Sequence, residues 1–100
     1  MAYEAGSLDG TIAAAAGHDP ELFAELRGAF AESLARQIDL LRRARCDGNW
    51  RMAALRLKGL AGSFHAERLI VLADEALEGA PGDPVVLRRL QQFHEQFVAG

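Results

Sequence analysis

The sequence predicts an all-α fold, an antiparallel up-down four-helix bundle. Apolar residues recur at steps of three and four over most of the chain, which is the spacing of a buried helix face. Asp19-Pro20 and Asp83-Pro84 begin two of these periodic stretches, and no stretch alternates apolar and polar residues as a strand does. Four amphipathic helices joined by short connections bury their apolar stripes most simply by packing side by side.

The first 18 residues stand apart from the predicted bundle, which covers residues 19–100. They mix Gly, Ser and Ala with little pattern, but Leu8 to Ala16 is apolar enough for a short extra helix that packs across one end of the domain. A chain of 100 residues has room for one hydrophobic core, so we expect no second domain.

The first long helix is predicted to begin at Asp19-Pro20-Glu21. Aspartate is a good N-cap, proline lacks an N–H that the first turn would leave unpaired, and glutamate favours the positive end of the helix dipole. Arg42, Arg43 and Arg45 suit the opposite end, and Asp47-Gly48-Asn49 is predicted to end the helix. The buried stripe is predicted to consist of Phe23, Leu26, Phe30, Leu34, Ile38 and Leu41.

The second long helix is predicted over Trp50 to His65, with Asp47 or Asn49 as its cap. Its outward side is apolar as well as its inward side, because Leu55 lies roughly 160° from Leu57 around the helix. Two glycines within this helix each cost about 1 kcal/mol relative to alanine, and a plain bundle helix has no need of them. Such an outward strip indicates a surface that binds a partner. The predicted inward residues are Trp50, Ala54, Leu57, Ala61 and Phe64, and the outward strip consists of Met52, Leu55, Gly59 and Gly62.

Two further helices are predicted after a break at Ser63 to Ala66. The third runs from Ala66 to Glu78 and ends at a turn formed by Gly79 and Pro81-Gly82-Asp83-Pro84, which no helix can cross. It is predicted to turn Leu69, Ile70, Ala73, Ala76 and Leu77 inward, with Leu72 on its flank. The last helix begins at Asp83-Pro84 and is predicted to bury Val86, Leu90, Phe93 and Phe97.

Composition and charge exclude several classes of function. The net charge is −3 and the basic residues are interleaved with acids, which disfavours a nucleic-acid surface. The longest apolar runs, Ile12 to Ala16 and Leu69 to Ala73, are far shorter than the roughly 20 residues of a membrane-spanning helix. No basic segment precedes an apolar one near residue 1, and the single cysteine, Cys46, cannot form an internal disulfide. We therefore expect a cytoplasmic protein.

Motifs of enzymes are also missing from the sequence. It contains no glycine-rich phosphate loop, no His-Glu-x-x-His, no cysteine pair and no serine in a glycine-flanked strand-to-helix turn. His18 precedes a helix cap and is expected to be solvated, and His94 is expected at the edge of the buried face of the last helix. The sequence predicts no catalytic residue, cofactor or metal site.

The second long helix resembles a family of signalling domains. The segment Leu55-Arg56-Leu57-Lys58-Gly59-Leu60-Ala61, with Gly48-Asn49-Trp50 before it and Ala66-Glu67-Arg68-Leu69 after it, is similar to the histidine phosphotransfer (HPt) domains of bacterial phosphorelays. That family carries a His-x-Leu-Lys-Gly signature on the second long helix of a four-helix bundle. The likeness extends over roughly Asp19 to Val98, and Leu57, Lys58 and Gly59 fit the signature directly.

Two positions depart from the family pattern. Leu55 stands where the family has the phosphorylated histidine, and His65 stands where it has a glycine. Leucine has no nucleophilic nitrogen, so phosphoryl transfer at this position by the family's mechanism is chemically excluded.

The resemblance therefore implies a non-catalytic module that binds a receiver domain or a histidine kinase without relaying phosphate. Gly59 would leave space for the partner's active site, while Leu55 and Met52 would cover its phosphoryl-accepting aspartate. Three cations would pair with its acidic rim. The predicted partner-binding residues are Arg51, Met52, Leu55, Arg56, Lys58, Gly59 and Gly62.

Two alternatives use the same helix differently. In one, the protein is an active phosphotransfer protein with an atypical acceptor, His65 or less plausibly His94. The ordinary interpretation of His65 is a structural residue at the helix break. In the other alternative, the outward strip is the interface of a homodimer.

Overall fold

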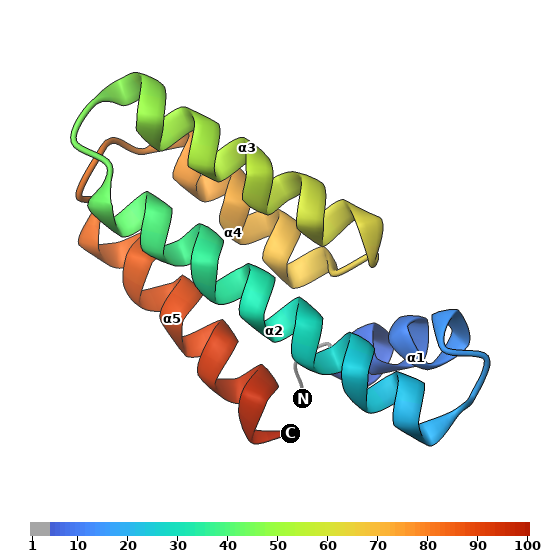
Figure 1. Ribbon diagram of the computed structural model, residues 1–100. Helices are drawn as coiled ribbons and strands as arrows, with labels where there is room; N and C mark the ends of the chain where they lie inside the picture. The colour runs from blue at the N-terminus through green and yellow to red at the C-terminus, as the bar shows by residue number, and fades with distance from the viewer. Residues whose placement is uncertain (1–4) are drawn as a thin grey trace.

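The computed structural model describes residues 5–100 of the chain, and five helices account for most of them (Figure 1). No β-strand occurs within this range, so the all-α prediction is confirmed. None of the helices described is both long and apolar enough to cross a membrane. The helices are α1 (Ala5–Ala15), α2 (Pro20–Arg43), α3 (Asp47–Ser63), α4 (Glu67–Glu78) and α5 (Pro84–Ala99).

Helices α2 to α5 lie side by side and contribute most of the hydrophobic core (Figure 1). Helix α2 packs against α3 and α5, and α4 also packs against α3 and α5. The stripe predicted for α5 is confirmed, because Val86, Leu90, Phe93 and Phe97 are all buried. In α2 the stripe is buried from Phe30 onward, whereas Phe23 and Leu26 are only half-buried.

Helix α1 packs against α2 and adds Leu8 and Ile12 to the core. Arg27 of α2 holds it in place, with Nε 2.9 Å from Oδ1 of Asp9. The same guanidinium donates a hydrogen bond of 2.6 Å to the carbonyl of Phe97 and lies 4.0 Å from the centre of that ring. One side chain thus connects α1, α2 and α5. The short N-terminal helix that the sequence predicts is confirmed.

The aspartate–proline pairs begin α2 and α5 as predicted. Oδ1 of Asp19 accepts hydrogen bonds from the backbone N–H groups two and three residues later, at 2.9 and 3.4 Å. Oδ1 of Asp83 does the same at 3.0 and 3.5 Å. Each aspartate satisfies donors that a helix leaves unpaired in its first turn, which explains why both helices begin sharply.

The end of α2 differs from the prediction. The helix ends at Arg43, and Asp47-Gly48-Asn49 forms the first turn of α3 instead of the end of α2. Nη1 of Arg45 approaches the carbonyls of Arg42 and Ala44 at 3.3 and 3.5 Å. An arginine side chain therefore satisfies carbonyls for which a glycine C-cap was expected.

The predicted cap of α3 is also wrong. Cys46 occupies the N-cap position and its side chain makes no capping hydrogen bond. Asp47 and Asn49 already lie inside the helix, so neither can cap it. Asp47 instead places a negative charge in the first turn, where it favours the helix dipole.

The buried face of α4 is rotated slightly from the predicted one. Leu72, expected on the flank, is 1% exposed, whereas Ile70 and Leu77 are only half-buried. Because α4 packs against both α3 and α5, its buried stripe is centred between these two neighbours. That stripe consists of Leu69, Leu72, Ala73 and Ala76.

Candidate functional site

The inward side of α3 anchors the helix to the core. Trp50, Ala54, Leu57 and Ala61 are buried as predicted, and Phe64 is half-buried against Phe30 at a ring separation of 5.2 Å. The indole N–H of Trp50 also donates a buried hydrogen bond of 2.6 Å to a carbonyl of α4. The orientation of the outward side of α3 is therefore fixed by its packing.

Two large apolar side chains lie exposed on the outward side of α3. Met52 is 53% exposed and Leu55 is 42% exposed. Helix α1 packs on α2 and leaves both exposed. The exposed cations Arg51 and Arg56 flank them, and neither forms an ion pair with the side chains that the structure describes. The apolar outward strip is therefore bordered by two unpaired positive charges.

The two glycines of this strip lie in open space. A Cβ atom at Gly59 or at Gly62 would meet no atom within 4 Å, so internal packing does not require glycine at either position. Both glycines are helical and lower the stability of the helix relative to alanine. Their effect is to leave the surface flat over the two turns that follow Leu55.

Lys58 points toward the neighbouring helix. Its Nζ lies 2.9 Å from Oδ1 of Asp74 on α4, and both side chains are about half exposed. An exposed pair of this kind contributes little to stability, about 0–1 kcal/mol. The ammonium group therefore remains available to an acidic partner only in competition with Asp74.

His65 lies just beyond the end of α3 in the left-handed backbone conformation, with φ of 55°. Its N–H donates to the carbonyl of Gly62 at 3.2 Å, and the N–H of Ala66 donates to the carbonyl of Ala61 at 2.9 Å. This pair of bonds is a Schellman motif, in which glycine is the usual residue at the left-handed position. The geometry gives His65 a structural place at the predicted break, and its side chain is exposed.

Replacing His65 by glycine should raise the free energy of unfolding. The left-handed conformation costs a residue with a Cβ roughly 1 kcal/mol or more, and glycine adopts it freely. We expect a gain of about 0.5–1 kcal/mol in urea denaturation. Gln92→Gly at an exposed position inside α5 is the control, where a loss of about 1 kcal/mol is expected. A loss of stability in His65→Gly would mean that the imidazole itself makes a stabilising contact.

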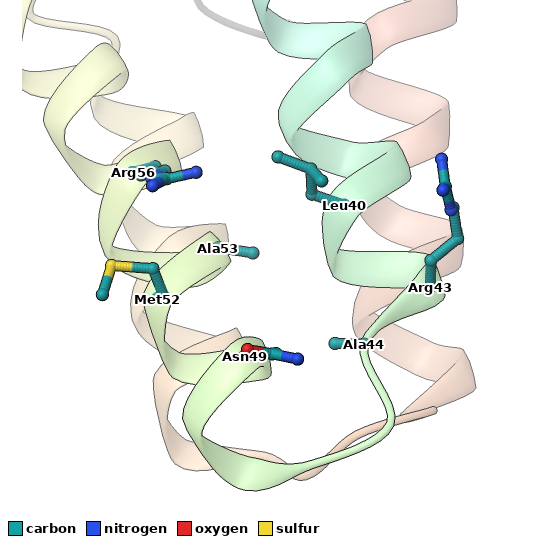
Figure 2. A pocket seen from close by; sticks show the side chains of 7 residues that line it. All are labelled: Leu40, Arg43, Ala44, Asn49, Met52, Ala53 and Arg56. Carbon is teal, nitrogen blue, oxygen red and sulfur yellow. The ribbon is translucent and has the colours of Figure 1, made fainter.

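A cleft beside the outward strip was not predicted from the sequence. It has a volume of about 410 Å³ and lies between the end of α2 and the first half of α3 (Figure 2). Leu40, 42% exposed, forms its α2 wall and falls outside the apolar stripe of that helix. The feature of the sequence that points to this region is the concentration of Lys and Arg in residues 36–58. The residues that line the cleft are Leu40, Arg43, Ala44, Asn49, Met52, Ala53 and Arg56.

The remaining histidines and acids in residues 5–100 form no further constellation. His18 is exposed and His94 is half-buried on α5, in line with the sequence expectations. Among the residues described, no group of three or more His, Cys, Asp or Glu side chains is placed to hold a metal ion.

Comparisons of the chain with models of known protein families, with curated proteins and with solved structures gave no match.

Proposed function

We propose that this chain is an HPt-like signalling module that binds a receiver domain through the outward side of α3 without accepting phosphate. In this proposal α2 to α5 form the antiparallel four-helix bundle of that family and α1 is an addition. The Leu57-Lys58-Gly59 match supports it, together with the position of Leu55 on an exposed helix face.

The observation that carries the proposal is the exposure of Leu55 and Met52 beside Gly59. A leucine side chain that is fully removed from water on docking contributes on the order of 1.5–3 kcal/mol. Because Gly59 lacks a side chain one turn later, a partner surface can approach the backbone of α3 closely. Binding, rather than chemistry, would then be the output of this face.

The charge around this face favours an acidic partner. Residues 36–58 contain seven of the eleven Lys and Arg residues and only two of the fourteen Asp and Glu residues. In the family that the chain resembles, the receiver presents its phosphoryl-accepting aspartate in an acidic pocket, which complements this field. A second copy of the chain would bring like charges together, so the homodimer is the less favoured occupant.

The proposed mechanism is occlusion of the receiver's active site. Leu55 and Met52 would cover the phosphoryl-accepting aspartate, and Arg51 and Arg56 would pair with the acidic rim. Lys58 would join them by exchanging Asp74 for a partner carboxylate, which costs little because the existing pair is exposed. No nitrogen at position 55 could take up the phosphoryl group.

Replacing Leu55 by glutamate tests this proposal. The variant should fold normally, because the side chain is exposed, but it should bind a receiver domain at least about tenfold more weakly. The measurement is a binding screen against purified receiver domains and histidine kinases, followed by titration of each partner found. Val85→Glu is the matched control, because Val85 on α5 is equally exposed at 42% and should leave binding unchanged.

Four results would contradict the proposal. Unchanged receiver binding by Leu55→Glu would show that Leu55 is not part of the docking face. An equal loss of affinity in Val85→Glu would show that an added negative charge weakens binding wherever it is placed. Acid-labile phosphate on His65 in the unmodified chain would favour active phosphotransfer. Light scattering that shows a dimer, dissociated by Leu55→Glu, would favour the homodimer.

A further inference from the structure

The cleft between α2 and α3 has an apolar floor and two polar ends (Figure 2). Ala44 and Ala53 form the floor and are both buried, and their small side chains leave the space above them open. Leu40 and the Arg56 side chain point toward each other across the gap in Figure 2, and Asn49 points into it from the first turn of α3. The cleft thus offers apolar contact beside one cation and one amide.

Arg56 is the cation of this cleft that is free to bind a ligand. Arg43 also borders the cleft, but its Nη1 lies 2.9 Å from Oδ2 of Asp39 and its side chain turns away from the gap (Figure 2). Arg56 forms no ion pair with any side chain that the structure describes, and its five N–H donors can bind a carboxylate through two parallel hydrogen bonds.

A second groove provides a contrast. It measures about 350 Å³ and is bordered by Phe23, Gly28 and Val98 with Arg27. The Arg27 guanidinium already binds Asp9 and the carbonyl of Phe97, so this groove has no free cation. Only the cleft at α2 and α3, of the two, combines apolar walls with an unpaired positive charge.

The electrostatic field at the cleft favours anions. It lies within residues 36–58, where cations outnumber acids by seven to two, although the whole chain carries a net charge of −3. A local positive field in a negatively charged chain attracts anionic ligands, and its strength decreases as salt is added.

We infer that this cleft binds a small amphipathic carboxylate, a compound with one carboxylate on an apolar body. The carboxylate binds the Arg56 guanidinium, the apolar body lies on Ala44 and Ala53 against Leu40, and the Asn49 amide meets a polar atom at the other end. The cleft volume of about 410 Å³ lies within the range of small-molecule sites, roughly 300–1,000 Å³. This site shares Arg56 and Met52 with the proposed docking face, but ligand binding in it is measured without a protein partner.

The test uses the fluorescent anion 8-anilinonaphthalene-1-sulfonate as probe and octanoate as competitor. We expect the probe to bind the full chain with a Kd on the order of tens of micromolar, and octanoate to displace it. Octanol and octylamine, which have the same apolar body without the negative charge, should displace it at least about tenfold less well. Amide shifts in NMR spectra with octanoate should be largest around Ala44, Asn49 and Ala53.

Two variants and one control locate the site. Arg56→Gln should raise the Kd for octanoate about tenfold because it removes the charge-assisted hydrogen bonds. Asn49→Phe, at an exposed position, should fill the cleft and abolish binding while every cation remains. Arg36→Gln is the control, because Arg36 belongs to the same basic segment and bonds only Ser33 among its described neighbours.

Each of the following results would overturn the inference. Equal competition by octanoate and octanol would show that the carboxylate is not recognised. An equal loss of affinity in Arg36→Gln and Arg56→Gln would show that Arg56 has no specific role. NMR shifts around Phe23 and Val98 would place the ligand in the other groove. Absence of any octanoate binding at millimolar concentration would overturn it as well. Octanoate binding to the unmodified chain is measured without a receiver, so failure to find any receiver partner leaves this result unaffected and the two proposals fail separately.

Discussion

Replacing Leu55 by histidine should give the chain a phosphoacceptor. The side chain at position 55 is 42% exposed, and Gly59 leaves open space one turn later. Lys58, between them, is half exposed and pairs with Asp74 of α4. If α3 is the docking face of an HPt-like fold, an imidazole at this position is presented to the receiver's phosphoaspartate with little rearrangement. We expect Leu55→His to take up radiolabelled phosphate from a phosphorylated receiver that binds the unmodified chain, and the unmodified chain to take up none.

The nature of the label identifies its site. Phosphohistidine is labile in acid and stable in base, and peptide mapping should place the label at position 55. Leu55→Gln has a polar side chain of similar size without a nucleophilic nitrogen and should remain unlabelled. Adding His65→Gln to Leu55→His should leave the labelling intact. If a receiver binds but Leu55→His stays unlabelled, the geometry of α3 differs from that of a phosphotransfer helix.

The helix starts of α2 and α5 could be predicted from the sequence because their signals are local. Asp19 and Asp83 each bond N–H groups two and three residues away, so no distant part of the chain is involved. The break predicted at Ser63 to Ala66 is also present, because α3 ends at Ser63 and His65 lies beyond it with φ of 55°.

The α2–α3 junction could not be predicted from the same rules. Gly48 looked like a helix stop, but the carbonyls at the end of α2 are bonded by Arg45, whose long side chain folds back on them. Glycine then has no role in the stop, and Gly48 joins the first turn of α3. Sequence rules for helix ends allow both a glycine stop and an arginine that bonds the last carbonyls, and they do not say which of the two occurs at this junction.

The candidate site was likewise predictable only in part. The outward placement of Met52 and Leu55 follows from helical periodicity, and both are exposed as the spacing predicts. The Lys58–Asp74 pair and the cleft at Leu40 depend on how α3 sits against α4 and α2. Contacts between helices need the register of one helix against the other, which no single stretch of sequence contains.

Trp50 is the position where substitution should cost most stability. Its side chain is 2% exposed, and its indole N–H donates a 2.6 Å hydrogen bond to the carbonyl of Ala76 in the last turn of α4. Trp50→Ala should therefore lower the free energy of unfolding by about 3–5 kcal/mol, through lost burial and the cavity left behind. A domain of this size is stabilised by about 5–15 kcal/mol, so the shift in the urea midpoint should be large.

Trp50→Phe separates packing from hydrogen bonding at this position. The Ala76 carbonyl also accepts a hydrogen bond of 3.0 Å from the N–H of Gly79, so losing the indole donor leaves it with one partner. A buried acceptor that keeps a partner avoids the full penalty of desolvation, and we expect Trp50→Phe to cost about 1–2 kcal/mol, well below Trp50→Ala. Equal losses in the two variants would mean that the indole hydrogen bond, rather than apolar packing, holds α3 against α4. In that case the outward face of α3 would owe its orientation to one polar contact at its N-terminal end.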